Sequence, residues 1–202
     1  MVARVSGQNC GVGRDEKVAA EKARLRVELL ATRAARSMPD LEWARAAIRG
    51  QVLDRVDEVE RVAAYLPLRT EPGSLELLSA LDARGIAVLV PVTLPDRDLD
   101  WARWTPRGAG ERLGVDAIRT AGLVLVPALA VASNGTRLGR GGGSYDRALA
   151  RCAAPTLLVA LLFDGEVVPR LPRDPWDVPV SAVVTPTGWI PVGGNAEVQF
   201  SG

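Results

Sequence analysis

The sequence contains no histidine among its 202 residues. This absence excludes histidine-dependent catalytic triads, histidine general bases and histidine metal ligands. There are only two cysteines, Cys10 and Cys152, which is too few for a disulfide framework or a cysteine-rich metal site. A bound metal ion would therefore need oxygen ligands, and this favours Mg²⁺.

An excess of charge and long apolar runs are also missing. The 25 basic and 24 acidic residues give a formal net charge of +1, so the chain lacks the positive field that drives non-specific nucleic-acid binding. We find no run of 18 apolar residues and no signal-peptide pattern. We expect a cytoplasmic protein that binds neither nucleic acid nor membranes, and we expect a monomer.

Composition divides the chain into three parts. Residues 1–15 are small, glycine-bearing and aperiodic, which predicts a disordered leader. Residues 193–202 predict a loose C-terminal tail for the same reason. Hydrophobic residues make up 48% of the chain, enough for the core of one catalytic α/β domain, which we predict over residues 16–192.

Short apolar runs alternate with helical segments along this domain. We predict helices over 16–36, 40–59, 74–84 and 144–151, strands over 59–66, 86–90, 123–126, 156–163 and 180–184, and an irregular segment over 93–120. Buried strands separated by helices indicate a mostly parallel sheet covered on both faces. Ligands bind beyond the carboxyl ends of such strands, so we expect loops 68–73, 91–95 and 127–143 to converge on one cleft.

A glycine-rich run, Arg137-Leu-Gly-Arg-Gly-Gly-Gly-Ser-Tyr-Asp146, ends the longest of these loops. Its glycines free the backbone for positive φ, so that successive N–H groups can turn toward one anion. Arg137 and Arg140 carry guanidinium forks suited to phosphate oxygens. Asp146 lies one turn into the predicted helix, in a position to hold a cation that bridges phosphates. The run predicts a phosphate-binding loop.

Two familiar phosphate-binding motifs fail to match this run. A P-loop needs a lysine before its serine or threonine, and none precedes Ser144. A dinucleotide-binding fingerprint needs a third glycine where Ser144 stands, and it needs a tight turn directly after a strand. Here residues 127–138 separate the predicted strand from Gly139.

Other charged and aromatic residues each allow two interpretations. In the first helix, Lys22, Arg26 and Arg33 share a face with the apolar stripe, so they either extend to water from its edge or point inward at an anion. Glu71, held extended by Pro72, and Asp177, between prolines, are either ordinary loop carboxylates or ligands. The two tryptophans of the irregular segment, Trp101 and Trp104, either cover an aromatic ligand or pack in the core.

Several blocks taken together resemble the 5-formyltetrahydrofolate cyclo-ligase family. They are Lys22-x-x-x-Arg26, Tyr65-Leu-Pro67, Glu71-Pro-Gly-Ser74, Leu123–Ala130, Gly135–Arg147, Leu171-Pro172 with Asp177, and Val184-Thr-Pro186. The blocks follow the family's order at similar spacing across roughly residues 20–188. The glycine run and the Glu-Pro pair are a specific combination.

The resemblance implies a three-layer α/β/α fold with a mostly parallel sheet, like that of ribose-5-phosphate isomerase and CoA transferases. It implies an enzyme that uses Mg²⁺ and ATP to close 5-formyltetrahydrofolate to 5,10-methenyltetrahydrofolate, with release of ADP and phosphate, through a phosphorylated formyl group. No histidine is needed for this chemistry, because phosphoryl transfer depends mainly on positioning and charge neutralisation.

The resemblance also implies roles for individual residues. ATP would contact Lys22, Arg26, Arg137, Leu138, Gly139, Arg140, Gly141, Gly142, Gly143, Ser144 and Tyr145. The folate would contact Leu66, Glu71, Arg140, Gly141, Gly142, Gly143 and Ser144. Asp146 and Asp177 would bind Mg²⁺, and Lys22 and Arg140 would act in catalysis by neutralising phosphate charge.

Three features depart from the family's pattern. Ser144 stands where a tyrosine is usual, Trp176 stands where a histidine often precedes the late aspartate, and the segment between Trp104 and Gly122 lacks a clear Gly-Ile-x-Glu-Pro block. Two alternatives follow. The chain is a divergent nucleotide-binding homologue with another substrate or a regulatory role, or it is a phosphosugar isomerase or CoA-transferase-like enzyme on the same fold.

Overall fold

The computed structural model describes residues 12–152 and 154–194. Residues 1–11 and 195–202, which make up most of the predicted leader and tail, lie outside the described residues. The first helix, α1, spans Val12–Ala34. The prediction of a disordered leader was therefore wrong for residues 12–15, which form the first turn of α1. Asp15 suits this turn because a carboxylate interacts favourably with the positive end of the helix dipole.

One eight-stranded sheet forms the centre of the molecule, with the strand order β11-β10-β8-β5-β1-β2-β3-β4. Its parallel part comprises β10 (Ala182–Thr185), β8 (Leu157–Leu161), β5 (Leu123–Pro127), β1 (Arg61–Ala63) and β2 (Ala87–Thr93). Antiparallel strands extend both edges: β11 (Gly188–Pro191) on one side, and β3 (Leu99–Thr105) and β4 (Gly108–Arg112) on the other. The predicted mostly parallel sheet is confirmed.

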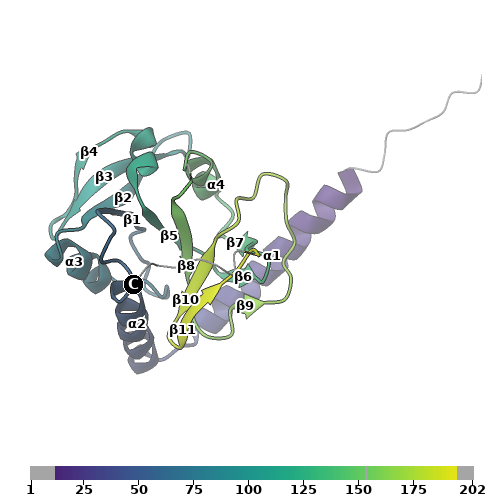
Figure 1. Ribbon diagram of the computed structural model, residues 1–202. Helices are drawn as coiled ribbons and strands as arrows, with labels where there is room; N and C mark the ends of the chain where they lie inside the picture. Colours follow the sequence, from purple (N-terminus) through teal and green to yellow (C-terminus); the bar gives the residue numbers. More distant parts are fainter. Residues whose placement is uncertain (1–11, 153, 195–202) are drawn as a thin grey trace, which may run out of the picture.

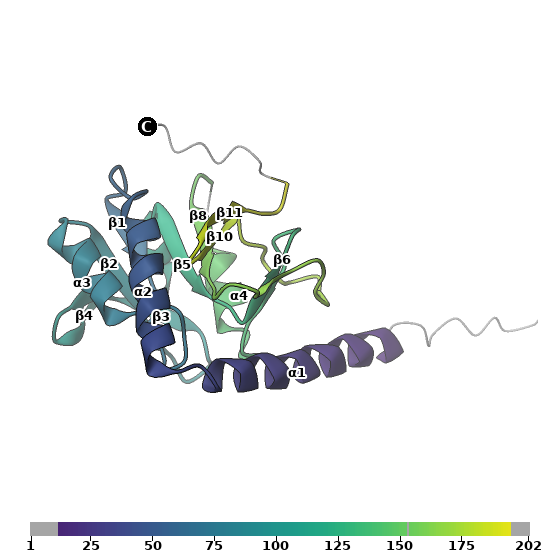
Figure 2. The ribbon, with the colours of Figure 1, turned by 90° about the horizontal axis from the view of Figure 1, so that it is seen from below.

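Helices cover both faces of this sheet (Figures 1 and 2). One face packs on α2 (Met38–Leu53) and α3 (Leu75–Ala83), the other on α4 (Ser144–Leu149) and the short 3₁₀ helix η1 (Val115–Thr120). Side chains alternate along β5, so that Leu123 and Leu125 enter the first core and Val124 and Val126 enter the second. The arrangement is the predicted three-layer α/β/α fold.

The prediction of an irregular segment over 93–120 was wrong. Most of this segment forms β3, β4 and η1, and the structure places Trp101 and Trp104 in the core, one on each face of the sheet. β2 also runs past Pro91, where a strand end was predicted. Proline is tolerated there because β1 pairs with β2 only as far as Leu89, so no neighbour on that side needs its N–H group.

Serine side chains cap the N-termini of α2 and α3. The Ser37 hydroxyl accepts a hydrogen bond from the Asp40 backbone N–H at 3.3 Å, so Ser37 caps α2 and the helix begins before residue 40, where it was predicted to start. Ser74 caps α3 by accepting a hydrogen bond from the N–H of Leu77 at 3.2 Å. Gly85, at φ +80°, ends α3.

α1 lies beside a small second sheet of β7 (Arg137–Leu138), β6 (Ala130–Ala132) and β9 (Val167–Val168), and its N-terminal end projects from the body (Figures 1 and 2). The buried Arg33 side chain anchors its other end. Arg33 donates to Glu166 Oε1 and Oε2 at 2.8 and 2.6 Å, and to the Ala128 carbonyl at 2.8 Å. Within the described residues, no helix is long and apolar enough to cross a membrane.

Candidate functional site

A cavity of about 430 Å³ opens at the carboxyl ends of β1, β2 and β5. Its walls come from the three loops that were expected to converge, and from α1, α4 and the segment before β10. All of the residues that the resemblance assigns to ATP, folate and magnesium line this cavity. Its volume lies in the usual range for small-molecule sites. The structure therefore brings the predicted site residues together around one cavity.

The glycine run folds tightly against α1. Gly141 has φ +99°, and a Cβ added there would lie 3.3 Å from Cζ of Arg26. Arg26 in turn donates from Nε to the Gly139 carbonyl at 2.9 Å. Gly143, at φ +69°, is the N-cap of α4. Glycine is therefore required at 141 and 143 for backbone conformation, and at 141 also because a cation lies against the chain.

Lys22 reaches into the cavity from α1 and is only 6% exposed. Its ammonium group donates to Asp174 Oδ2 at 2.7 Å and to Asp177 Oδ2 at 2.6 Å. Lys22 and Arg26 therefore point inward to the cavity instead of extending to water. Arg33, on the same face of the helix, forms a structural ion pair with Glu166. Sequence reasoning missed Asp174, although its place three residues before Asp177 in the same proline-bounded segment was a usable signal.

Arg137 is buried beneath the glycine run. Its Nη2 donates to Asp146 Oδ1 at 2.6 Å, and the same oxygen accepts the Val178 N–H at 3.1 Å. Burial lowers the pKa of Arg137, and the charge of Asp146 opposes that shift. Asp146 therefore ties the glycine run to the segment that follows Asp177.

Two carboxylates, Asp146 and Asp177, face the cavity as the predicted metal ligands. Their hydrogen bonds within the described residues use only Oδ1 of Asp146 and Oδ2 of Asp177. The described part of the chain contains no group of three or more acidic, histidine or cysteine side chains arranged to hold a metal ion. The protein thus offers one free oxygen from each of two carboxylates.

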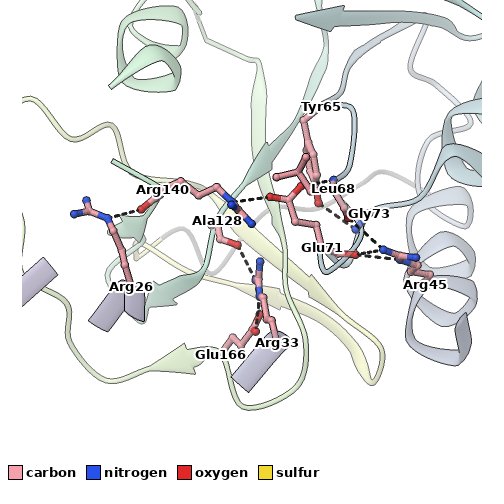
Figure 3. Close-up of polar contacts among 11 residues, drawn as sticks. Arg26, Arg33, Arg45, Tyr65, Leu68, Glu71, Gly73, Ala128, Arg140 and Glu166 are labelled. Atoms are coloured by element: carbon pink, nitrogen blue, oxygen red, sulfur yellow. Dashed lines mark hydrogen bonds and ion pairs between the residues drawn. The ribbon is translucent and has the colours of Figure 1, made fainter. Parts of the chain in front are cut away.

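The opposite wall of the cavity is the turn at residues 68–71. Glu71 is 5% exposed, and its Oε2 accepts the Leu68 N–H at 2.9 Å. Its Oε1 accepts from Nε of Arg140 at 3.1 Å, so the glycine run and the turn meet through this ion pair (Figure 3). Leu66, which is partly exposed, lines the cavity beside them.

Two tyrosines line the cavity between these walls: Tyr65, which is buried, and Tyr145, which is half-buried. Tyr65 accepts the Gly73 N–H at 3.1 Å through its hydroxyl oxygen. The Tyr145 hydroxyl has no hydrogen-bond partner among the described residues. Burial raises the pKa of both tyrosines well above the usual range, and the nearby Glu71 carboxylate adds to the shift. Both hydroxyls are therefore neutral donors at physiological pH.

The departures from the family's pattern fall in different places. Ser144 lines the cavity, so a missing aromatic ring there changes the site itself. Trp176 is 67% exposed and does not line the cavity. The segment between Trp104 and Gly122, which forms part of the sheet edge and η1, also contributes nothing to the lining.

A parallel α/β sheet with a glycine run, buried cations and paired carboxylates beyond its strand ends defines an enzyme site for an anionic small molecule. The particular family follows from comparison. The sequence model of the 5-formyltetrahydrofolate cyclo-ligase family matches residues 18–186, and the chain belongs to this family.

Relatives agree with this assignment. The chain is 37% identical over 183 residues to a 5-formyltetrahydrofolate cyclo-ligase of Mycolicibacterium smegmatis, covering 82% of this chain and 93% of the relative. The fold matches that of a 5,10-methenyltetrahydrofolate synthetase from Mycoplasma pneumoniae, with TM-score 0.71, 19% identity, and coverage of 82% and 99%. A synthetase of the same name from Aquifex aeolicus gives TM-score 0.67 and 25% identity, with coverage of 88% and 96%.

Proposed function

We propose that this chain converts 5-formyltetrahydrofolate to 5,10-methenyltetrahydrofolate, with ATP as co-substrate and with ADP and phosphate as the other products. Family membership supports the reaction. The single structural observation that carries the proposal is the contact between Arg140 and Glu71. It joins a wall suited to phosphates to a wall suited to a neutral heterocycle, as a reaction between ATP and a folate requires.

The chemistry proceeds in two steps. The oxygen of the formamide attacks the γ-phosphorus of ATP, and the bond from that phosphorus to ADP breaks. The N10 amine of the same folate then attacks the activated formyl carbon and loses its proton, and the carbon–oxygen bond to phosphate breaks. Neither step needs a covalent enzyme intermediate, so the protein contributes orientation and charge neutralisation.

The glycine run and its cations are the proposed ATP wall. Lys22, Arg26 and Arg140 would neutralise phosphate charge, and the backbone N–H groups of residues 139–145 would donate to phosphate oxygens. Such preorganised donors need no reorganisation when charge develops, so they stabilise that charge more strongly than water does. Arg137 lies deeper, where its ion pair with Asp146 holds the run in place.

The Glu71 turn is the proposed folate wall. The carboxylate of Glu71 would accept hydrogen bonds from the polar edge of the pterin, and Leu66 would pack against a ring. Glycines 141–143 and Ser144 would contact the folate from the other side. Arg140 serves both walls, which suits a residue placed where the phosphoryl group passes from one substrate to the other.

Mg²⁺ belongs to the proposal because the two available carboxylates fit it. Mg²⁺ sites commonly use one or two carboxylates together with substrate phosphates and waters. Asp146 and Asp177 would hold the ion with the oxygens that their protein contacts leave free. When bound, Mg²⁺ would neutralise charge on the ATP phosphates. The cytoplasmic location, the monomeric state and the domain limits 16–192 stay predictions.

The test is a spectrophotometric assay for the methenyl product with 5-formyltetrahydrofolate and Mg²⁺, with ATP present and with ATP omitted. We expect the product band to rise only when ATP is present. Folded protein that forms no product would reject the proposed function. Binding of ATP without turnover would favour a divergent nucleotide-binding homologue, and turnover of a phosphosugar without ATP would favour an isomerase.

A further inference from the structure

Arg45 of α2 holds the turn that carries Glu71. Its Nε donates to the Glu71 carbonyl at 3.0 Å, and its Nη2 donates to the same carbonyl at 2.9 Å. Nη2 also donates to the carbonyls of Arg69 and Leu68, at 2.7 and 3.3 Å. One guanidinium group therefore donates to three carbonyl groups of a single turn; Figure 3 shows Arg45 and its contacts with Glu71.

The turn at residues 68–71 makes its other main-chain hydrogen bonds internally, within the described part of the chain; one of them runs from the Leu68 N–H to Glu71 Oε2. The turn lies between the end of β1 at Ala63 and the start of α3 at Leu75, and no strand pairs with it. Its own closing hydrogen bond runs from the Glu71 N–H to the Leu68 carbonyl at 3.0 Å. Bonds from a charged, planar donor group are stronger and more directional than neutral ones. Arg45 therefore ties the main chain of the turn to α2, while the Glu71 side chain contacts Arg140 of the glycine run.

The base of Arg45 is itself rigid. Leu41, Ala44 and Ile48 of α2 are buried, and Ser37 caps the helix, so the backbone at residue 45 is fixed against the core. Arg45 does not line the cavity. It touches the main chain of the turn from behind, while the Glu71 side chain points forward to Arg140.

We propose that Arg45 is a positioning residue for the folate wall. By fixing the Glu71 main chain it keeps the carboxylate aimed at both Arg140 and the bound 5-formyltetrahydrofolate, without touching either substrate. This inference rests on the proposed function. It means that a residue outside the cavity positions the folate wall but not the ATP wall.

The test separates the two substrates. Arg45→Ala should raise the KM for 5-formyltetrahydrofolate about tenfold, because small displacements of a positioning group cost this much or more. The KM for ATP should stay within about twofold, since a displaced Glu71 disturbs Arg140, while the more distant Lys22 and Arg26 keep their own contacts. Arg45→Lys should give an intermediate KM, because lysine keeps the charge but loses the fork. Calorimetric titration with 5-formyltetrahydrofolate alone should show the tightest binding for wild type, weaker binding for Arg45→Lys and the weakest for Arg45→Ala.

The control is Arg49→Ala, one turn further along α2, which removes the same charge; among the described residues Arg49 makes no hydrogen bond to the turn. It should leave both KM values unchanged. Equal rises in both KM values, an unchanged Arg45→Ala enzyme, or an Arg49→Ala effect of the same size would each overturn the assignment. If Arg45→Ala fails to fold, Arg45→Lys and Arg45→Gln test the proposal in the same way, by comparing the change in the KM for 5-formyltetrahydrofolate with the change in the KM for ATP. Inactive wild-type protein would instead reject the proposed function.

Discussion

The two walls of the cavity are held in different ways. On the glycine side, side-chain charges from distant parts of the chain pair with one another: Lys22 with Asp174 and Asp177, and Arg137 with Asp146. On the turn side, a single arginine binds main-chain carbonyl groups from outside the cavity. The first wall therefore places its charges inside the site, while the second keeps its supporting charge behind the backbone.

This difference suits two kinds of ligand. In the proposed function, a polyphosphate needs cations that can exchange their protein carboxylates for phosphate oxygens, and we expect Lys22 and Arg140, which pair with Asp177 and Glu71, to make this exchange. A neutral ring system needs an acceptor held at one angle, which the Glu71 turn provides. Variants that disturb only one wall should therefore change the handling of only one substrate.

The largest effect is expected on the glycine side, from Lys22→Ala. This change removes a phosphate-neutralising charge and leaves two carboxylates without their shared cation. We expect kcat/KM for ATP to fall on the order of 100-fold, the usual cost of losing one charge-stabilising donor. Steady-state kinetics with ATP varied at saturating 5-formyltetrahydrofolate measures it.

Lys17→Ala is the matched control for this variant, because Lys17 is the only other lysine and lies exposed on the same helix. It should behave as wild type. If the two variants lose activity equally, Lys22 has no special role in the ATP wall.

A smaller effect on the same wall is expected from Gly141→Ala. The residue has φ +99°, which costs an alanine about 1–2 kcal/mol, and the new methyl group would press on Arg26. We expect the KM for ATP to rise about tenfold, since 1.4 kcal/mol corresponds to one decade. Gly85→Ala is the control, because Gly85 has φ +80° and an added Cβ would meet nothing within 4 Å, but the residue does not line the cavity. An equal rise in the KM for ATP in Gly85→Ala would refute the assignment of Gly141 to the ATP wall.

The parallel half of the sheet was predictable, and its antiparallel extension was not. β5 and β8 are continuous apolar runs bounded by proline or polar residues, the pattern of strands buried on both faces. β3 contains Asp100 and Arg103 among its tryptophans, so its sequence lacks both a continuous apolar run and a clean alternation. The charge of Asp100 is accommodated by an ion pair with Arg112 of β4, a contact that only the fold reveals.

The same distinction applies to the site. That the glycine run, Lys22 and Glu71 lie around one cavity could be predicted, because motif and helical periodicity are local properties of the sequence. Arg45 could not, because an arginine at the edge of the α2 apolar stripe looks like any solvated helix residue until the turn is folded against it. The role of Arg33 could not be predicted either. Helical periodicity places Arg33 on the same face of α1 as Lys22 and Arg26, but its ion pair with Glu166, which gives it a structural role, depends on the fold.

The central claim is that the two walls bind different substrates, and calorimetric titration of two isosteric variants tests it most directly. Glu71→Gln alters the turn wall, and Asp177→Asn alters the ATP wall. We predict that Glu71→Gln weakens 5-formyltetrahydrofolate binding about tenfold, as expected for losing a charged hydrogen-bond acceptor, and leaves ATP binding with Mg²⁺ unchanged or tighter. Asp177→Asn should do the reverse. Equal losses for both ligands in either variant would contradict the account.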